Sequence, residues 1–171
     1  MVSNAVAGAA VGYALGLTVD EIKAGIEGLP SIPGRNNIIK TDRLIILDDC
    51  YNANPISMKA SIDVLNMAIG RKVAILGNMG ELGTNEKELH KEVGTYAAEN
   101  HIDLVCGIGD LAKDLIEGVT EVNSSTEGIW FATKEDFFHS MKEILKDGDN
   151  ILVKASHGMN FPEIVSALET L

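Results

Sequence analysis

The sequence predicts an α/β fold: a Rossmann-like, doubly wound and mostly parallel sheet with helices on both faces, preceded by two short helices. The alternation of two kinds of segment supports this fold class. From residue 72 onward, short runs of Val, Ile and Leu alternate with amphipathic helical segments. Apolar runs of this kind are typical of parallel strands that helices cover on both sides. Right-handed crossovers between such strands produce a doubly wound sheet.

The first 33 residues predict two short helices and no strand. Residues 3–16 are rich in Ala and Gly, and residues 19–28 begin with acids, which the helix dipole favours in a first turn. The stretch 29–34 contains two Pro and a Gly and predicts a linker. Two helices without a sheet cannot enclose a core. We therefore expect residues 1–33 to be the tail of another domain, and residues 34–171 to form a domain of their own.

The second domain is expected to contain a hairpin followed by regular alternation of strands and helices. The expected elements are strands 37–40 and 43–47 joined by a turn at 41–42, helix 57–68, strand 72–76, helix 85–100, strand 103–106, helix 110–118, strand 129–131, helix 134–146, strand 150–153 and helix 161–170. A two-residue turn joins the first two strands, so they should pair antiparallel. Every later strand is followed by a helix, which is the pattern of parallel βαβ units.

Composition and charge exclude several classes of function. The net charge of −11 argues against non-specific nucleic-acid binding, which needs a basic face. No run of about 18 apolar residues is present, so no membrane span is expected. The N-terminus lacks the basic segment of a signal peptide. Cys50 and Cys106 are far apart and have no metal-ligand spacing, which favours reduced thiols in a cytoplasmic protein.

The most informative motif is residues 48–58, which read DDCYNANPISM. It follows the apolar run 44–47 and precedes a predicted helix, so acids, a phenol and carboxamides stand where a strand gives way to a helix. Open α/β sheets bind ligands at such positions. These groups suit the hydroxyl and amino groups of a ribose or a purine. The two Asn and the Pro are also ordinary turn formers, so a plain turn is the alternative interpretation.

Two further loops are predicted to leave the same edge of the sheet. Residues 77–83 read GNMGELG, and three Gly allow the backbone to approach a ligand closely, although a flexible turn into the next helix explains them equally well. Residues 154–157 read KASH and follow the last strand. Lys154 and Ser156 are better candidates than His157, which is more simply a solvated loop residue. Three loops on one edge predict a pocket.

Other patterns carry less information. Residues 107–112 fit the dinucleotide pattern G-x-G-x-x-A, but no strand-end acid follows about 20 residues later, so a strand end and helix cap is the simpler interpretation than NAD binding. His90, His101 and His139 lie among Glu and Lys in or beside predicted helices, and we expect them to be exposed. No zinc or hydrolase-triad motif is present, and no metal site is predicted.

Four segments together resemble the Mur ligases, an ATP-dependent family that makes peptidoglycan precursors. They are PGR at 33–35, DDCYNANP at 48–55, GNMGELG at 77–83 with His90, and LVKAS at 152–156. The YNANP signature is most similar to the members that add D-Ala-D-Ala to UDP-N-acetylmuramoyl-tripeptide. The resemblance implies that residues 1–33 hold the last helices of the family's central ATPase domain and a linker, and that residues 34–171 are its C-terminal, substrate-binding domain.

The resemblance also implies a reaction and roles for individual residues. ATP would phosphorylate the tripeptide carboxylate, and the amine of D-Ala-D-Ala would attack the acyl phosphate, with Mg²⁺ as the second cofactor. Residues expected near the nucleotide are Asn4, Arg35, Asp49, Asn52 and Asn54. Residues expected near the dipeptide and the reacting carboxylate are Asn78, Glu81, Lys154, Ser156 and His157.

Some features depart from the family pattern. The family usually has Asp where Asn78 stands, a bulkier apolar residue at Gly80 and Arg where His157 stands. The 171 residues contain no G-x-x-x-x-G-K-[ST] phosphate loop. We therefore expect a fragment that lacks the N-terminal and central domains, binds no nucleotide tightly and is inactive alone. Two alternatives are a folylpolyglutamate- or cyanophycin-synthetase-like ligase, against which the YNANP signature argues, and a non-catalytic binding module of the same fold.

Overall fold

The computed structural model describes residues 2–30, 32–122 and 124–171. The chain divides between residues 31 and 32 into two compact units. In the first unit, α1 (Val2–Ala14) and α2 (Val19–Glu27) form the two predicted helices. Thr18 caps α2 through a capping box with Glu21. The side chains of Tyr13, Leu15 and Val19 are exposed, and α2 has no buried residue, so the described side chains of this unit enclose no core.

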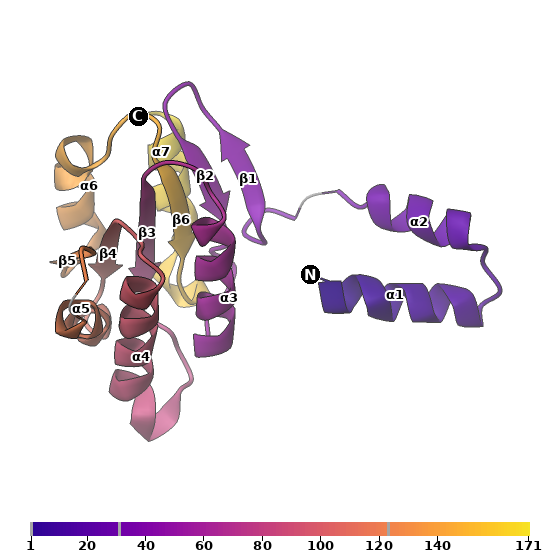
Figure 1. Cartoon of the computed structure of the whole chain (residues 1–171), viewed down its shortest axis with the longest axis horizontal. Helices are drawn as coiled ribbons and strands as arrows, with labels where there is room; N and C mark the ends of the chain where they lie inside the picture. The colour runs from indigo at the N-terminus through magenta and orange to yellow at the C-terminus, as the bar shows by residue number, and fades with distance from the viewer. Residues whose placement is uncertain (1, 31, 123) are drawn as a thin grey trace. The chain divides into compact units, whose positions relative to one another are not determined.

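The second unit confirms the predicted fold class: a six-stranded, mostly parallel sheet with helices on both faces (Figure 1). The strand order is β1-β2-β6-β3-β4-β5, and only β1 runs antiparallel to its neighbour. The strands are β1 (Asn37–Lys40), β2 (Ile45–Asp48), β3 (Lys72–Gly77), β4 (Leu104–Ile108), β5 (Glu127–Phe131) and β6 (Asn150–Lys154). The helices are α3 (Pro55–Asn66), α4 (Glu86–Glu99), α5 (Ala112–Glu121), α6 (Lys134–Ile144) and α7 (Pro162–Glu169). None of the helices described is long and apolar enough to cross a membrane.

The hairpin that opens the unit has a longer turn than predicted. Strand β2 begins at Ile45 rather than at Arg43. The reason is Thr41, whose hydroxyl accepts hydrogen bonds from the backbone N–H of Arg43 at 3.2 Å and of Leu44 at 2.9 Å. A Thr side chain that binds the backbone in this way competes with strand pairing, so the turn extends to Leu44.

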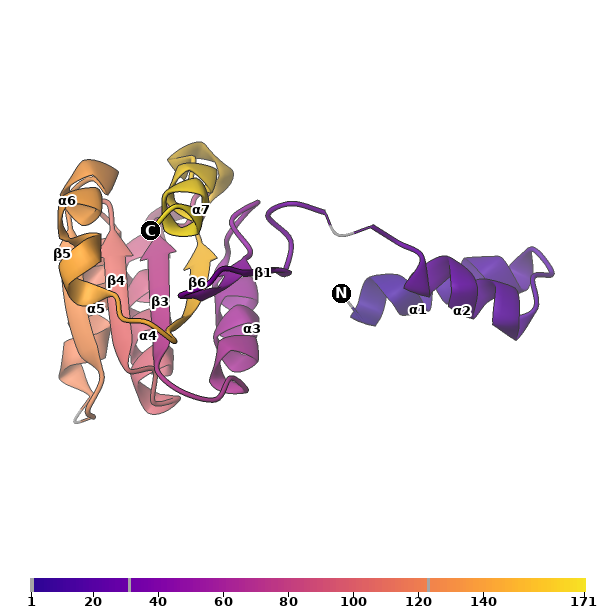
Figure 2. The ribbon, with the colours of Figure 1, turned by 90° about the horizontal axis from the view of Figure 1, so that it is seen from above.

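Helices cover both faces of the sheet (Figure 2), and each face has its own hydrophobic core. Helices α3, α4 and α5 cover one face, where Ile62, Val93 and Leu115 pack on strand residues. Helices α6 and α7 cover the other face with Phe137 and Phe161. Helices α4 and α5 approach closely at two glycines: a Cβ on Gly94 would lie 1.8 Å from Leu115 O, and one on Gly118 would lie 2.1 Å from Lys91 O.

The position of β6 creates the crevice of the fold. Successive crossovers move from β2 to β3, β4 and β5 with their helices on one face, and α6 returns the chain on the other face to place β6 between β2 and β3. The segment after β6 therefore leaves toward one face, while the segments after its two neighbours leave toward the other. In doubly wound sheets such a switch point opens a crevice at the carboxyl ends of the strands.

Candidate functional site

A buried ion pair stands at this switch point. Asp49 follows the end of β2, and Lys154 is the last residue of the adjacent strand β6. Asp49 is 8% exposed and Lys154 is 2% exposed. The Lys154 ammonium donates to the Asp49 carboxylate, and also to the backbone oxygens of Asp49 at 3.3 Å and Asn52 at 3.1 Å. A buried charge pair costs desolvation energy, and these additional hydrogen bonds offset part of that cost.

The Asp49 carboxylate connects three separate segments. Besides Lys154, it accepts a hydrogen bond from the Ser61 hydroxyl on α3 at 2.6 Å. Its other oxygen accepts from the backbone N–H of Asn36 at 3.1 Å. Asn36 has a φ of 51°, a left-handed conformation that Asn tolerates better than most residues. Sequence reasoning missed both Asn36 and Ser61, although Ser61 lies one helical turn after Ser57 on the same side of α3.

Three exposed side chains form a stack beside this pair. The Arg35 guanidinium carbon lies 3.9 Å from the centre of the Tyr51 ring, and the rings of Tyr51 and His157 lie 5.8 Å apart at a tilted angle of 50°. The Tyr51 N–H donates to Gly34 O at 2.9 Å, which ties the Arg35 loop to the DDCYNANP segment. Gly34 has a φ of +75°, and a Cβ there would lie 3.1 Å from Tyr51 N. Only Gly satisfies both requirements.

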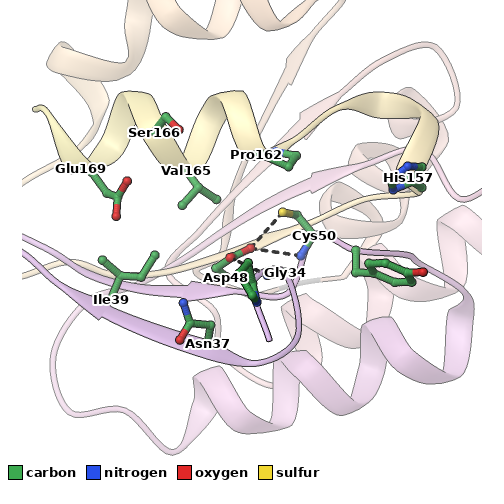
Figure 3. Close-up of a pocket in the computed structure, with 12 residues that line it drawn as sticks. Gly34, Asn37, Ile39, Asp48, Cys50, His157, Pro162, Val165, Ser166 and Glu169 are labelled. Carbon is green, nitrogen blue, oxygen red and sulfur yellow. Dashed lines mark hydrogen bonds between the residues drawn. The ribbon is translucent and has the colours of Figure 1, made fainter. Parts of the chain in front are cut away.

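A cavity of about 380 Å³ lies between this stack and α7 (Figure 3). Asp48 and Cys50 form its floor, Val165 lies on its α7 side and His157 stands at one end. The Asp48 carboxylate accepts hydrogen bonds from Gly34 N–H at 2.8 Å and from the Cys50 thiol at 2.9 Å. Burial, with Asp48 as a second cause, raises the pKa of the Cys50 thiol to about 12, so the sulfur stays protonated and acts as a donor.

The loop after β3 joins the site through Ser156. The Gly80 N–H donates to the Ser156 hydroxyl at 2.6 Å, and the Ser156 N–H donates to Asn78 O at 3.0 Å. The Asn78 side chain accepts from Ala112 N–H at 3.0 Å, so it anchors the start of α5. Glu81 is exposed and has a φ of 61°. The loop after β3 is thus held against the loop after β6.

The expectation that His90 is exposed is wrong. His90 has no exposed surface, whereas His101 and His139 are exposed as predicted. Its charged neighbours in sequence suggested a solvated side chain, but His90, Val93 and Ala97 share one buried face of α4. This i, i+3, i+7 spacing is the signal that could have identified it.

Some of the predicted site residues lie close together, and others do not. Arg35, Asp49, Lys154, Ser156 and His157 gather at the carboxyl edge of β2 and β6. Asn52 and Asn54 are exposed nearby, but Asn52 accepts from its neighbour Ala53 N–H and Asn54 caps α3 by accepting from Ser57 N–H at 2.8 Å. Asn4 is exposed on α1 in the first unit. Within the described part of the chain, no three His, Cys, Asp or Glu side chains gather as a metal site would require.

Comparisons with known proteins give similar sequences and similar folds. The sequence profile of the family described as "Mur ligase, glutamate ligase domain" matches residues 34–157. The chain is 38% identical over 170 residues to UDP-N-acetylmuramoyl-tripeptide–D-alanyl-D-alanine ligase of Bacillus subtilis, covering 98% of this chain and 37% of that protein. Two solved structures are similar. MurF from Acinetobacter baumannii has a TM-score of 0.87 and 30% identity, covering 98% of this chain and 37% of that one. MurF ligase from Thermotoga maritima in complex with ADP has a TM-score of 0.78 and 29% identity, covering 94% and 36%. The chain spans little more than a third of the length of these relatives.

Proposed function

The chain belongs to the Mur ligase family, and we propose that it acts as the C-terminal domain of an ATP-dependent ligase that joins D-alanyl-D-alanine to UDP-N-acetylmuramoyl-tripeptide. The observation that carries the proposal is the junction of the buried Asp49–Lys154 pair with the exposed Arg35 stack at the switch point of the sheet. The names of the similar ligases support the choice of substrates.

The proposed reaction has two steps. The γ-phosphoryl group of ATP passes to a carboxylate oxygen of the tripeptide, which gives an acyl phosphate and ADP. The amine of D-alanyl-D-alanine then attacks the carbonyl carbon, the C–O bond to phosphate breaks, and the amide forms as phosphate leaves and the amine loses a proton. Both steps concentrate negative charge on phosphoryl oxygens, so fixed positive groups accelerate them.

Arg35 is the residue that we assign to the phosphates of the nucleotide. Arg35 is exposed, and its guanidinium carbon lies 3.9 Å from the centre of the Tyr51 ring, a contact that limits its rotamers. Arg remains charged at all physiological pH values and offers planar, paired donors to phosphate oxygens. Tyr51 therefore serves as a platform that positions Arg35.

Asp49 is the residue that we assign to the ribose. One of its oxygens accepts a firm hydrogen bond from Asn36 N–H at 3.1 Å and a long one of 3.5 Å from the Asn36 side chain. A ribose hydroxyl would take the place of the long contact. The other oxygen of the carboxylate stays paired with Lys154 in this role.

The loops at Ser156 and at 78–83 are proposed to face the acceptor dipeptide. Ser156 is half-buried and joins these loops, and Glu81 and His157 extend from them into solvent. An ammonium or carboxylate group of the dipeptide would meet Glu81 or His157 there. Because the Lys154 charge is already paired with Asp49, we assign to Lys154 the positioning of both the Asp49 and Asn52 segments.

The proposed reaction also needs Mg²⁺ and a phosphate loop. No metal-ligand cluster exists among the residues that the structure describes, so we derive no step through Mg²⁺ in this chain. We place Mg²⁺ and the phosphate loop elsewhere in the enzyme, with residues 1–33 as the end of its central ATPase domain. We further propose that the enzyme works in the cytoplasm, and that the 171-residue chain alone neither ligates nor binds ATP tightly.

A domain exchange tests this proposal. The matching 37% of the Bacillus subtilis ligase is replaced by this chain, and phosphate release is measured with ATP, UDP-N-acetylmuramoyl-tripeptide and D-alanyl-D-alanine. We expect release that depends on the dipeptide, and none with D-glutamate as the acceptor. A folded exchange protein that prefers glutamate, or that releases no phosphate with any acceptor, would contradict the proposal.

A further inference from the structure

The loop that follows β3 (residues 78–85) is held by a histidine outside the site already described. His90 lies on α4 with no exposed surface. Its Nε2 accepts a hydrogen bond from Met79 N–H at 2.8 Å, and its Nδ1 lies 2.6 Å from Glu86 O. Since Met79 N–H can only donate and Glu86 O can only accept, the ring must be neutral with its proton on Nδ1.

Burial of the His90 ring favours this neutral state, although the charged groups around it do not. The charged side chains that act on it are Glu86 on its own helix and Asp114 on α5, and both favour the protonated ring. Burial outweighs them and lowers the pKa of His90. A proton on Nε2 would point an N–H at the Met79 N–H and would remove the hydrogen bond that holds the loop.

The contacts of the loop connect His90 to the acceptor side of the site. Met79 is fully buried, and the next residue, Gly80, donates its N–H to the Ser156 hydroxyl at 2.6 Å. On the other side of Met79, Asn78 O accepts from Ser156 N–H at 3.0 Å. The residue that His90 fixes therefore lies between two residues that both bind Ser156.

We propose that His90 is a positioning residue for the ligation, because it fixes Met79 and thereby places Asn78, Gly80 and Ser156 in the register that receives the acceptor dipeptide. This inference rests on the proposed function. His90 does not touch the substrate, and its effect passes through one backbone N–H. If that hydrogen bond is lost, a buried N–H is left without a partner and the loop must shift to reach solvent.

A matched pair of substitutions separates positioning from packing. In His90→Gln the amide oxygen reaches the place of Nε2 and keeps the bond to Met79 N–H. In His90→Asn the shorter amide reaches only the place of Nδ1 and keeps the bond to Glu86 O. Both variants lose the buried ring. The exposed His139 supplies the control, His139→Asn.

The first measurement is amide hydrogen exchange at Met79 and Gly80 in the 171-residue chain. We expect His90→Asn to lose protection at both amides by about tenfold or more, while His90→Gln and His139→Asn stay close to the native chain. Equal protection in His90→Gln and His90→Asn would overturn the inference, because it would show that the ring nitrogen does not hold the loop.

The second measurement is steady-state ligation in the exchange protein described above. His90→Asn should lower kcat/KM for D-alanyl-D-alanine by about tenfold or more with the KM for ATP unchanged, and His90→Gln should retain most of the activity. If the unsubstituted exchange protein is active, and His90→Asn and His90→Gln are equally active or equally impaired, this inference alone is overturned. An exchange protein without activity before any substitution would instead overturn the proposed function, and the catalytic part of this inference with it.

Discussion

A buried acid is paired with a cation at each end of strand β6. Asp149 precedes the strand and accepts from the Arg71 guanidinium at 2.8 Å, and Lys154 ends the strand and pairs with Asp49. Both acids are almost completely buried. Both pairs join a buried carboxylate to a cation, although the Arg71 side chain is 24% exposed and the Lys154 side chain only 3%.

Their surroundings differ. Arg71 also donates to Ile144 O at 3.2 Å, and Asp149 also accepts from Lys146 N–H at 2.8 Å, so this pair closes the turn that leads from α6 into β6. At the other end, the exposed Arg35 and His157 surround the pair, and Asn36 adopts a left-handed backbone. A buried ion pair therefore fixes the local backbone at either end of the strand and does not by itself indicate a binding site. The exposed groups and unusual backbone around it distinguish a site from a structural turn.

The ion pairs at the two ends of β6 should differ most in their effect on ligation activity. In the exchange protein, Lys154→Met should lower kcat/KM for ligation by about a hundredfold, because Asp49 and the Asn52 segment lose the group that positions them. Arg71→Met, which removes a cation of similar length at the opposite edge, should change kcat/KM by less than about threefold in the folded enzyme. Steady-state kinetics of both variants check this, and equal losses would mean that the two pairs share one role.

The next effect is on stability. Arg71→Met should lower the free energy of unfolding of the 171-residue chain by about 3 kcal/mol, because it leaves the Asp149 carboxylate buried without its cation. Asp149→Asn added to Arg71→Met should restore part of this loss, and chemical denaturation of the single and double variants measures the coupling. Additive losses would show that the two side chains do not interact.

A pH dependence of stability is expected from His90. Burial lowers its pKa in the folded chain below the ordinary value of 6.5, so between these two values the unfolded chain binds a proton that the folded chain does not. The free energy of unfolding should therefore fall as pH decreases below about 6.5, and it should stop falling from this cause below the folded pKa. Urea titrations between about pH 5 and pH 8 test this. The same slope in His90→Gln would assign the dependence to other groups.

The smallest effect concerns Asn54, which the resemblance places near the nucleotide. Its side chain caps α3 in a capping box with Ser57, so Asn54→Ala should cost about 1 kcal/mol of stability. If the cap is its whole role, the KM for ATP in the exchange protein stays unchanged. A raised KM beside a small loss of stability would give Asn54 the binding role as well.

The sequence predicted the elements well because local rules decide them. Runs of Val, Ile and Leu mark β3 and β6. Helix α3 begins at Pro55, two residues before its expected start, because Asn54 caps it and Pro55 suits its first turn. Local patterns could not predict that β6 lies between β2 and β3, because this strand order depends on the return crossover through α6. Pattern and resemblance identified the residues at the carboxyl edge but not their pairings.

The partners of Asp49 show where sequence reasoning ended. Its position after a strand suggested a free binding carboxylate, whereas the structure pairs it with Lys154, 105 residues away, and with Ser61. Contacts at that separation depend on which strands are neighbours. The prediction that His90 is exposed was wrong for a different reason. The local sequence held the signal, the helical spacing of the buried face of α4, but the charged neighbours of His90 were given more weight.

We propose that the nucleotide binds at the carboxyl edge of the sheet and not at the amino edge, and a matched pair of Arg variants tests this. Arg35→Ala and Arg43→Ala each remove one guanidinium from an exposed residue, the first at the carboxyl edge and the second in the β1–β2 turn at the amino edge. We expect Arg35→Ala to raise the KM for ATP in the exchange protein by about tenfold or more, because one charge-assisted hydrogen bond to the nucleotide is lost. Arg43→Ala should leave this KM unchanged. Equal KM values for the two variants would contradict the account.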